Sequence, residues 1–194
     1  MTESTFAQRW AGESGLPYWE AGSGETIVAI IDGERPPTRA HALLAERRRI
    51  MVFAMTADLG PQEEAHRIGA AVGALGVERF DLMGEGAGAT TAMWLAATPQ
   101  TKIGSVVLAA PDGLPDEAFR EMKRPVLVLS GTKDQSDADD RYRTLLPDCH
   151  FMFVYDAGRD ICAERPEALA FIALEFFERR DLFLVSRESV IALP

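Results

Sequence analysis

The sequence predicts an α/β fold, specifically a three-layer α/β/α sandwich built on a mostly parallel sheet. Short runs rich in Val, Ile, Leu and Ala alternate with segments of helical length. The short runs are apolar at nearly every position. Strands that are apolar on both sides are typical of a parallel sheet that helices cover on both faces. Because strands and helices alternate regularly, we expect a doubly wound sheet.

The predicted elements follow one another in a regular order. The segments with the length and composition of buried strands are residues 26–31, 49–54, 80–83, 105–110, 126–129 and 151–155. The segments with helical length and an apolar stripe are residues 39–47, 62–75, 87–97, 138–146 and 166–177. Pro99 and Pro147 end two of these helices, and Gly76 caps a third. The basic run at residues 47–49 closes the first helix, and we interpret it as a solvated cap at the negative end of that helix.

The composition limits the possible functions. The chain has 194 residues, of which 47% are hydrophobic and 26% charged, as in an ordinary globular domain. Twenty Lys and Arg against thirty Asp and Glu give a net charge of −10, so we expect no nucleic-acid partner. No apolar run reaches the length of about 18 residues that a membrane helix needs, so we expect no membrane association. The two cysteines are Cys149 and Cys162. Because the start carries no secretory leader, we interpret them as reduced thiols in a cytoplasmic protein.

No repeat, linker or low-complexity tract divides the chain, so we expect a single domain over residues 1–194. Residues 1–15 are expected to be loosely ordered. Residues 181–194 form an apolar tail after the last predicted helix. One interpretation of this tail is a strand or strap that packs on the core. The other is a segment that docks onto a second subunit, as in a homodimer, or onto another protein partner.

Ligands of an open parallel sheet bind at the carboxyl ends of its strands. The loops at these ends carry a set of phrases with which the chain resembles the α/β-hydrolase fold family, over residues 18–177. Residues 18–24 are similar to that family's opening hairpin, residues 76–84 to the approach to its nucleophile elbow, residues 125–134 to its acid loop, and residues 157–158 with 164–167 to the loop of its histidine. The order and spacing of these phrases carry the resemblance.

The resemblance implies a Ser-His-Asp hydrolase, yet the nucleophile position differs. The family's elbow reads Gly-x-Ser-x-Gly, and here the same positions read Gly84-Glu85-Gly86-Ala87-Gly88. Gly86 therefore stands where the serine is expected, and it has no side chain with which to attack a carbonyl. Glycine accepts a positive φ at little cost, whereas another residue is strained there by about 1–3 kcal/mol. We therefore expect a positive φ at Gly86.

The histidine position differs as well. Asp134 keeps the family's acid position, but Arg159 stands where the histidine is expected. Arginine stays protonated and does not transfer protons at neutral pH. We expect Asp134 and Arg159 to form an ion pair that joins the two loops. His41 and His66 fall within helices, and His150 begins a strand at the opposite edge of the sheet, so we interpret all three as surface or packing residues.

The oxyanion region departs from the family too, because Asp32-Gly33 stands where the family commonly has His-Gly. The backbone N–H groups of Glu34 and Ala87 can still form an anion-binding cradle at a helix start. The carboxylates of Asp32, Glu34 and Glu85, however, would repel a developing oxyanion. We expect a small-molecule ligand, if any, to bind at these residues on the carboxyl edge of the sheet.

The family's lid is also missing from the sequence. Residues 113–124 alone separate two predicted strands where such hydrolases insert a longer segment, and residues 116–122 have room for about two helical turns. A site without a lid is shallow and open to water.

Two hypotheses follow for the function. Gly86 and Arg159 favour a catalytically impaired hydrolase-like protein that acts in binding, regulation or assembly. Alternatively, Glu85, Asp32 and Asp134 cluster and raise one another's pKa, so that one of them serves an active hydrolase or related enzyme as general base or nucleophile. Their spacing matches no metal motif, and we expect no metal and no cofactor.

A third hypothesis is a dinucleotide-binding domain. Residues 84–89 approximate Gly-x-Gly-x-x-Gly/Ala between a strand and a helix, and Asp112 follows about 20 residues later. The motif lies in the middle of the predicted sheet rather than at its first strand, which makes this hypothesis the weakest of the three.

Overall fold

The protein is built on one eight-stranded sheet with the strand order β1-β2-β4-β3-β5-β6-β7-β8. The computed structural model describes residues 6–12, 15–33, 35–56, 58–98, 102–112, 119–120, 122–134, 138–146 and 149–183. The strands are β1 (Ala7–Ala11), β2 (Leu16–Ala21), β3 (Thr26–Ile31), β4 (Arg49–Ala54), β5 (Arg79–Glu85), β6 (Lys102–Ala109), β7 (Val126–Gly131) and β8 (His150–Val154). Strand β2 pairs in antiparallel fashion with both β1 and β4, and the pairs from β4 through β3 to β8 are parallel.

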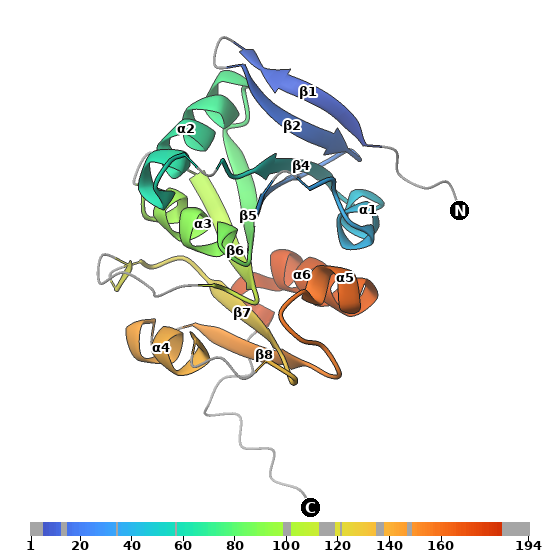
Figure 1. Cartoon of the computed structure of the whole chain (residues 1–194), viewed down its shortest axis with the longest axis vertical. Coiled ribbons are helices and arrows are strands. Elements are labelled where there is room, and N and C mark those ends of the chain that lie inside the picture. Colours follow the sequence, from blue (N-terminus) through green and yellow to red (C-terminus); the bar gives the residue numbers. More distant parts are fainter. Residues whose placement is uncertain are drawn as a thin grey trace, which may run out of the picture.

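Helices cover both faces of this sheet, as Figure 1 shows. The helices are α1 (Arg39–Ala45), α2 (Pro61–Ala74), α3 (Gly88–Ala97), α4 (Ala138–Leu145), α5 (Ile161–Glu164) and α6 (Pro166–Arg179), followed by the 3-10 helix η3 (Arg180–Phe183). Helices α2, α3 and α4 lie on one face, and α1, α5 and α6 lie on the other. The expected three-layer α/β/α sandwich is therefore confirmed.

The core divides into two apolar layers because successive side chains of a strand point to opposite faces. All six residues of β3 are buried. Val28 and Ile30 of this strand pack beneath α2 and α3, whereas Ile27, Ala29 and Ile31 pack beneath α1 and α6. The continuous apolar runs in the sequence therefore reflect strands that are covered on both sides.

Two parts of the chain differ from the sequence-based expectation. Residues 1–15 were expected to be loosely ordered, but Ala7–Ala11 form the edge strand β1, which pairs with β2. Four of its five residues are exposed, so it lacks the apolar pattern of a buried strand. The short helix α5 was not expected either. Residues 113–118 and 121, in the short segment where the family has its lid, lie outside the described residues, as do residues 184–194 of the tail.

A buried charge network ties the last helix to the amino-terminal edge of the sheet. Asp81 of β5 is 3% exposed and accepts a hydrogen bond from Ser105 Oγ of β6 at 2.8 Å. The guanidinium groups of Arg48 and Arg180 lie 3.5 and 3.7 Å from its carboxylate. Arg48 also pairs with Glu25 at 2.5 Å and is 5% exposed. The interpretation of residues 47–49 as a solvated cap is therefore wrong for Arg48, which is a buried partner of the sheet.

Asp81 gives the fold a testable dependence on pH. Burial raises the pKa of its carboxyl, although Ser105, Arg180 and Arg48 act to lower it. When folding raises the pKa of a carboxyl, the protonated group stabilises the folded protein. This stabilisation is complete below the unfolded-state pKa of about 3.9 and is lost as the pH rises through the folded-state pKa. We therefore expect the free energy of unfolding of Asp81→Asn, relative to the unsubstituted protein, to increase as the pH rises above about 4. Urea unfolding at a series of pH values measures this difference.

Ser105→Ala serves as the companion variant. It removes the hydrogen bond that lowers the pKa of Asp81, so the loss of stability with rising pH should extend to higher pH than in the unsubstituted protein. Parallel pH profiles for Asp81→Asn and the unsubstituted protein would show that Asp81 does not titrate as described.

Candidate functional site

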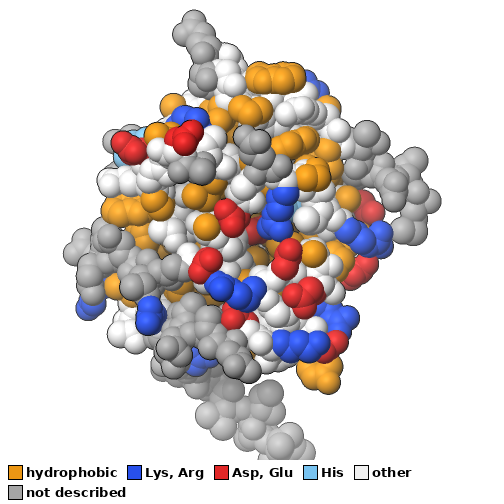
Figure 2. Space-filling model, in the orientation of Figure 1, with side chains coloured by type: hydrophobic (Ala, Val, Ile, Leu, Met, Phe, Trp, Pro, Cys, Tyr) orange, Lys and Arg blue, Asp and Glu red, His pale blue; other side chains and the backbone are white. Residues whose placement is uncertain are grey.

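A pocket of about 270 Å³ opens at the carboxyl ends of the central strands. The residues that line it are Asp32, Arg35, Glu85, Gly86, Ala109, Ala110, Asp112, Arg159, Asp160, Ile161 and Cys162. They come from the loop after β3, the β5–α3 turn, the end of β6 and its following loop, and the segment that leads into α5. Acidic and basic side chains interleave across the middle of the face seen in Figure 2.

The β5–α3 turn, which the sequence resemblance assigns to the elbow, carries glycine at its tip. Gly86 has φ 53°, which confirms the expected left-handed conformation. A Cβ at Gly84 would lie 2.6 Å from Ala89 Cα, and a Cβ at Gly88 would lie 2.4 Å from the Ile30 carbonyl oxygen. No such contact is met at Gly86, where the nearest atom to a Cβ would be 3.9 Å away. Close packing of α3 against β3 and β5 therefore requires glycine on either side of the elbow, while the tip has space.

The residue before the tip, Glu85, is buried between two basic side chains. Its side chain is 2% exposed, with Oε1 at 2.8 Å from His41 Nε2 and Oε2 at 2.9 Å from Arg35 Nη2. The Thr38 backbone N–H donates to His41 Nδ1 at 2.9 Å. Because Nδ1 accepts this bond, the ring proton lies on Nε2, and Nε2 faces the Glu85 carboxylate at 2.8 Å.

His41 is therefore a buried member of the site, and our interpretation of it missed this role. It is indeed part of a packed helix, but its side chain is 0% exposed and joins α1 to the elbow. A sequence signal existed: Thr38 stands three residues before His41 at the start of a predicted helix, which is the spacing of a reciprocal cap. The other two histidines lie away from the pocket, His66 on α2 against the Gln62 carbonyl and His150 at the opposite edge of the sheet.

Cys162 contacts the same carboxylate from α5. Burial and the Glu85 charge raise the pKa of the Cys162 thiol well above its ordinary value, so the thiol stays protonated and donates to Glu85. Burial alone would raise the pKa of the Glu85 carboxyl, but His41, the Cys162 thiol and Arg35 outweigh it and hold that pKa below its ordinary value. The two shifts in pKa therefore favour an ionised carboxylate beside a protonated thiol.

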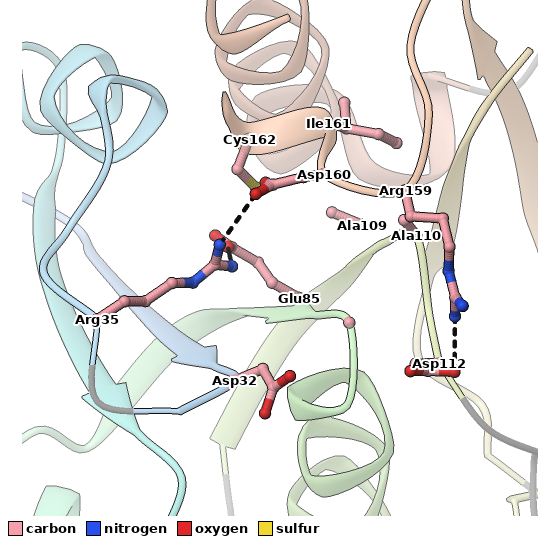
Figure 3. Close-up of a pocket in the computed structure, with 11 residues that line it drawn as sticks. Asp32, Arg35, Glu85, Ala109, Ala110, Asp112, Arg159, Asp160, Ile161 and Cys162 are labelled. Atoms are coloured by element: carbon pink, nitrogen blue, oxygen red, sulfur yellow. Dashed lines mark hydrogen bonds and ion pairs between the residues drawn. The ribbon is translucent and has the colours of Figure 1, made fainter. Parts of the chain in front are cut away.

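Arg35 extends this cluster to the wall of the pocket. In Figure 3 its guanidinium reaches both Glu85 and Asp160. The distance from its Nη1 to Asp160 Oδ2 is 3.3 Å. The other oxygen of Asp160 accepts the Ala163 N–H at 3.2 Å and so caps α5. Arg35 thus connects the loop after β3, the elbow and α5. No motif in the sequence predicted this connection.

The partner of Arg159 differs from our expectation. Its guanidinium pairs with Asp112 at 2.6 Å, as Figure 3 shows, rather than making the expected pair with Asp134. The Asp112 carboxylate raises the pKa of Arg159, and Asp134 contributes a smaller effect of the same sign. Asp112 also donates its backbone N–H to the Gly86 carbonyl at 2.9 Å. The ion pair therefore joins the loop before α5 to the elbow through the loop after β6.

The remaining predicted residues are placed as follows. Asp32 and Gly33 are exposed at the end of β3, with φ 65° at Gly33. Ala87 immediately precedes α3, and Glu34 lies outside the described residues. Asp32 and Glu85 line the pocket, but Asp134 is not among the described residues that do so. Within the described ranges, no group of three or more His, Cys, Asp or Glu side chains is arranged to hold a metal ion.

Comparison with known proteins identifies the fold. No family model and no curated sequence matches the chain. The chain is similar to the solved structure of CarC, a serine hydrolase involved in carbazole degradation, with a TM-score of 0.77 and 16% identity over 91% of this chain and 100% of that one. It is also similar to naproxen esterase from Bacillus subtilis, with a TM-score of 0.74 and 13% identity over 90% of this chain and 92% of that one. A predicted CIB-like hydrolase from Thermoplasma acidophilum matches with a TM-score of 0.71 and 15% identity over 89% of this chain and 98% of that one. The chain thus has the α/β-hydrolase fold. Of the helices in the described ranges, none is long and apolar enough to cross a membrane.

The elbow generates a prediction about stability. Gly88→Ala forces a Cβ to 2.4 Å from a backbone oxygen and should destabilise the protein by more than about 3 kcal/mol. Gly86→Ala meets open space and should cost about 1–2 kcal/mol, which is the strain of a positive φ. Gly73→Ala in α2, where a Cβ also meets open space, is the matched control and should stabilise by about 0.5–1 kcal/mol. Urea unfolding ranks the three variants, and equal effects at Gly86 and Gly88 would contradict the steric analysis.

Proposed function

We propose that this protein is a catalytically impaired member of the α/β-hydrolase fold, a pseudoenzyme that acts by binding rather than by ester hydrolysis. The observation that carries the proposal is the elbow, whose tip at Gly86 has the required left-handed turn and no side chain. Its function is a binding, regulatory or assembly role centred on the pocket at the carboxyl edge of the sheet.

The neighbouring groups support this proposal because they do not replace the missing serine. Cys162 is held as a neutral thiol, and the Glu85 carboxylate is shared among three donors. The histidine position is an arginine that pairs with Asp112. The imidazole of His41 is 0% exposed. Its Nδ1 accepts the Thr38 N–H and its Nε2 faces Glu85, so it does not open onto the pocket as a general base would need to.

The pocket favours a small polar ligand. Its walls carry the carboxylates of Asp32, Glu85, Asp112 and Asp160 against the guanidinium groups of Arg35 and Arg159. Both guanidinium groups form ion pairs, with Glu85, Asp160 and Asp112. Asp32 is exposed on the rim, and no ion pair with another described residue accounts for its carboxylate. A hydroxyl or ammonium group of a ligand would find an acceptor there.

The alternative is an enzyme that uses a carboxylate in place of the triad. Asp32 is the specific group that favours it, because this carboxylate lies beside the elbow tip, with its Cβ 3.9 Å from where a side chain would begin at Gly86. A general base needs such an accessible and unengaged carboxylate. Binding of NAD or FAD, the dinucleotide hypothesis, has only the glycine pattern of the elbow in its favour. We further infer a cytoplasmic location from the two cysteines, both of which are free thiols.

Hydrolysis of short-chain p-nitrophenyl esters tests the proposal. We expect the purified protein to match buffer, and Asp32→Asn, Glu85→Gln and Asp134→Asn to share the same background rate, because no nucleophile–base pair is assembled. A serine esterase provides the positive control. Turnover by the unsubstituted protein that is lost in one variant would overturn the proposal and identify that carboxylate as catalytic.

A second test separates a structural from a catalytic role for Glu85. Glu85→Gln removes the charge that pairs with Arg35 and His41 and should lower the free energy of unfolding by about 1–3 kcal/mol. Asp32→Asn, on the exposed rim of the same pocket, is the matched control and should change it by less than about 0.5 kcal/mol. Chemical unfolding of both variants measures the difference. A Glu85→Gln protein as stable as Asp32→Asn would contradict a structural role for the buried carboxylate.

A further inference from the structure

The two edges of the sheet are protected to different degrees. β1 carries Arg9, whose guanidinium pairs with Glu20 of the next strand at 2.8 Å. β8, at the opposite edge, reads His-Phe-Met-Phe-Val and contains no Lys, Arg, Asp, Glu, Pro or Gly. Sheet edges of monomeric proteins are usually blunted by charges, prolines or bulges. β8 has none of these devices over its five residues.

The outward groups of β8 can be assigned from its pairing with β7. The Val154 carbonyl accepts the Thr132 N–H at 3.0 Å, so Val154 directs its backbone groups toward β7. Because backbone groups alternate sides along a strand, Phe151 and Phe153 direct their N–H and C=O groups to the open edge. The side chain of Phe153 is 53% exposed there, and Tyr155 just beyond the strand is 84% exposed.

The end of the described chain argues against a further strand of the same sheet beside β8 that would follow α6. η3 lies at the amino-terminal edge of the sheet, where Arg180 contacts Asp81, so a tail strand beside β8 would run parallel to it. Two connections along the chain lead from one strand toward the β8 side of the sheet, β5–α3–β6 and β7–α4–β8. Their helices lie on one face of the sheet, whereas α6 lies on the other face. A connection through α6 to a new parallel strand beside β8 would therefore be a left-handed crossover. About 98% of such crossovers are right-handed.

We propose that β8 is the interface of a homodimer, in which two copies pair their β8 strands in antiparallel fashion about a twofold axis at Met152. This register sets Phe151 opposite Phe153 of the partner subunit, and both residues present outward backbone groups, so each such pair exchanges two hydrogen bonds. The aromatic side chains of Phe151 and Phe153 lie on the same face and stack across the strands.

Charge also favours this edge for self-association. The chain carries a net charge of −10, so two copies repel one another over most surfaces. β8 itself contributes no acidic group. The Arg143 guanidinium lies 4.7 Å from the centre of the Phe151 ring, where the proposed register brings Phe153 of the partner subunit. A cation beside this aromatic pair adds a favourable contact rather than a repulsion.

Light scattering coupled to size exclusion tests the proposal on the full chain. We expect twice the mass of one chain at micromolar concentration, and the mass of one chain for Phe153→Lys, because a charge on an open edge blocks strand pairing. Phe153 is exposed, so the fold should tolerate lysine there. Phe171→Lys on α6, at another exposed phenylalanine (67%), and Trp10→Lys on β1 are matched controls that should remain dimeric.

Hydrogen exchange of the Phe151 and Phe153 amides provides an independent readout that does not depend on a variant. In the proposed dimer their protection increases with protein concentration. A single-chain mass at all concentrations would overturn the proposal, as would a dimer that persists in Phe153→Lys. Protection that is independent of concentration in a monomer would also overturn it, and would assign the edge to the tail or another segment of the same chain.

Discussion

The candidate site depends on one buried carboxylate. Glu85 lies at the last position of the central strand β5, where the sheet is covered on both faces, and its charge needs partners to be tolerated there. His41 supplies one from α1, Arg35 a second from the β3 loop, and Cys162 a third from α5. Three segments that are far apart in the sequence are thereby fixed around the elbow, and the shape of the pocket follows from that requirement.

The same constraint sets the direction of the polar contacts around the pocket. A catalytic triad needs a nucleophile, a base and an acid in a chain of hydrogen bonds that leads to the substrate. Here Thr38 donates to His41, and His41 faces the buried Glu85 carboxylate. At the rim, the pairing of Arg159 with Asp112 joins the loop before α5 to the loop after β6. These polar groups hold the walls of the pocket together.

Local physical chemistry made most of the fold predictable from the sequence. Largely apolar runs predicted β3 to β8, and the glycine at position 86 predicted the left-handed turn. The sequence did not predict β1, because four of its five residues are exposed and they carry no periodic pattern. The contacts within the site were not predicted for a different reason. His41 and Glu85 are brought together by the packing of α1 on the sheet, and Arg159 has two acidic loops within reach, so sequence spacing did not decide between Asp112 and Asp134.

The tight packing at Gly84 and Gly88 has a consequence for how distant relatives are recognised. These glycines are required by the approach of α3 to β3 and β5, a requirement that exists whether or not the turn carries a reactive group. Selection for folding therefore maintains the small residues whatever the central position carries. A search pattern that fixes the two flanking glycines and leaves the central position open would detect this chain, whereas a pattern anchored on serine would not.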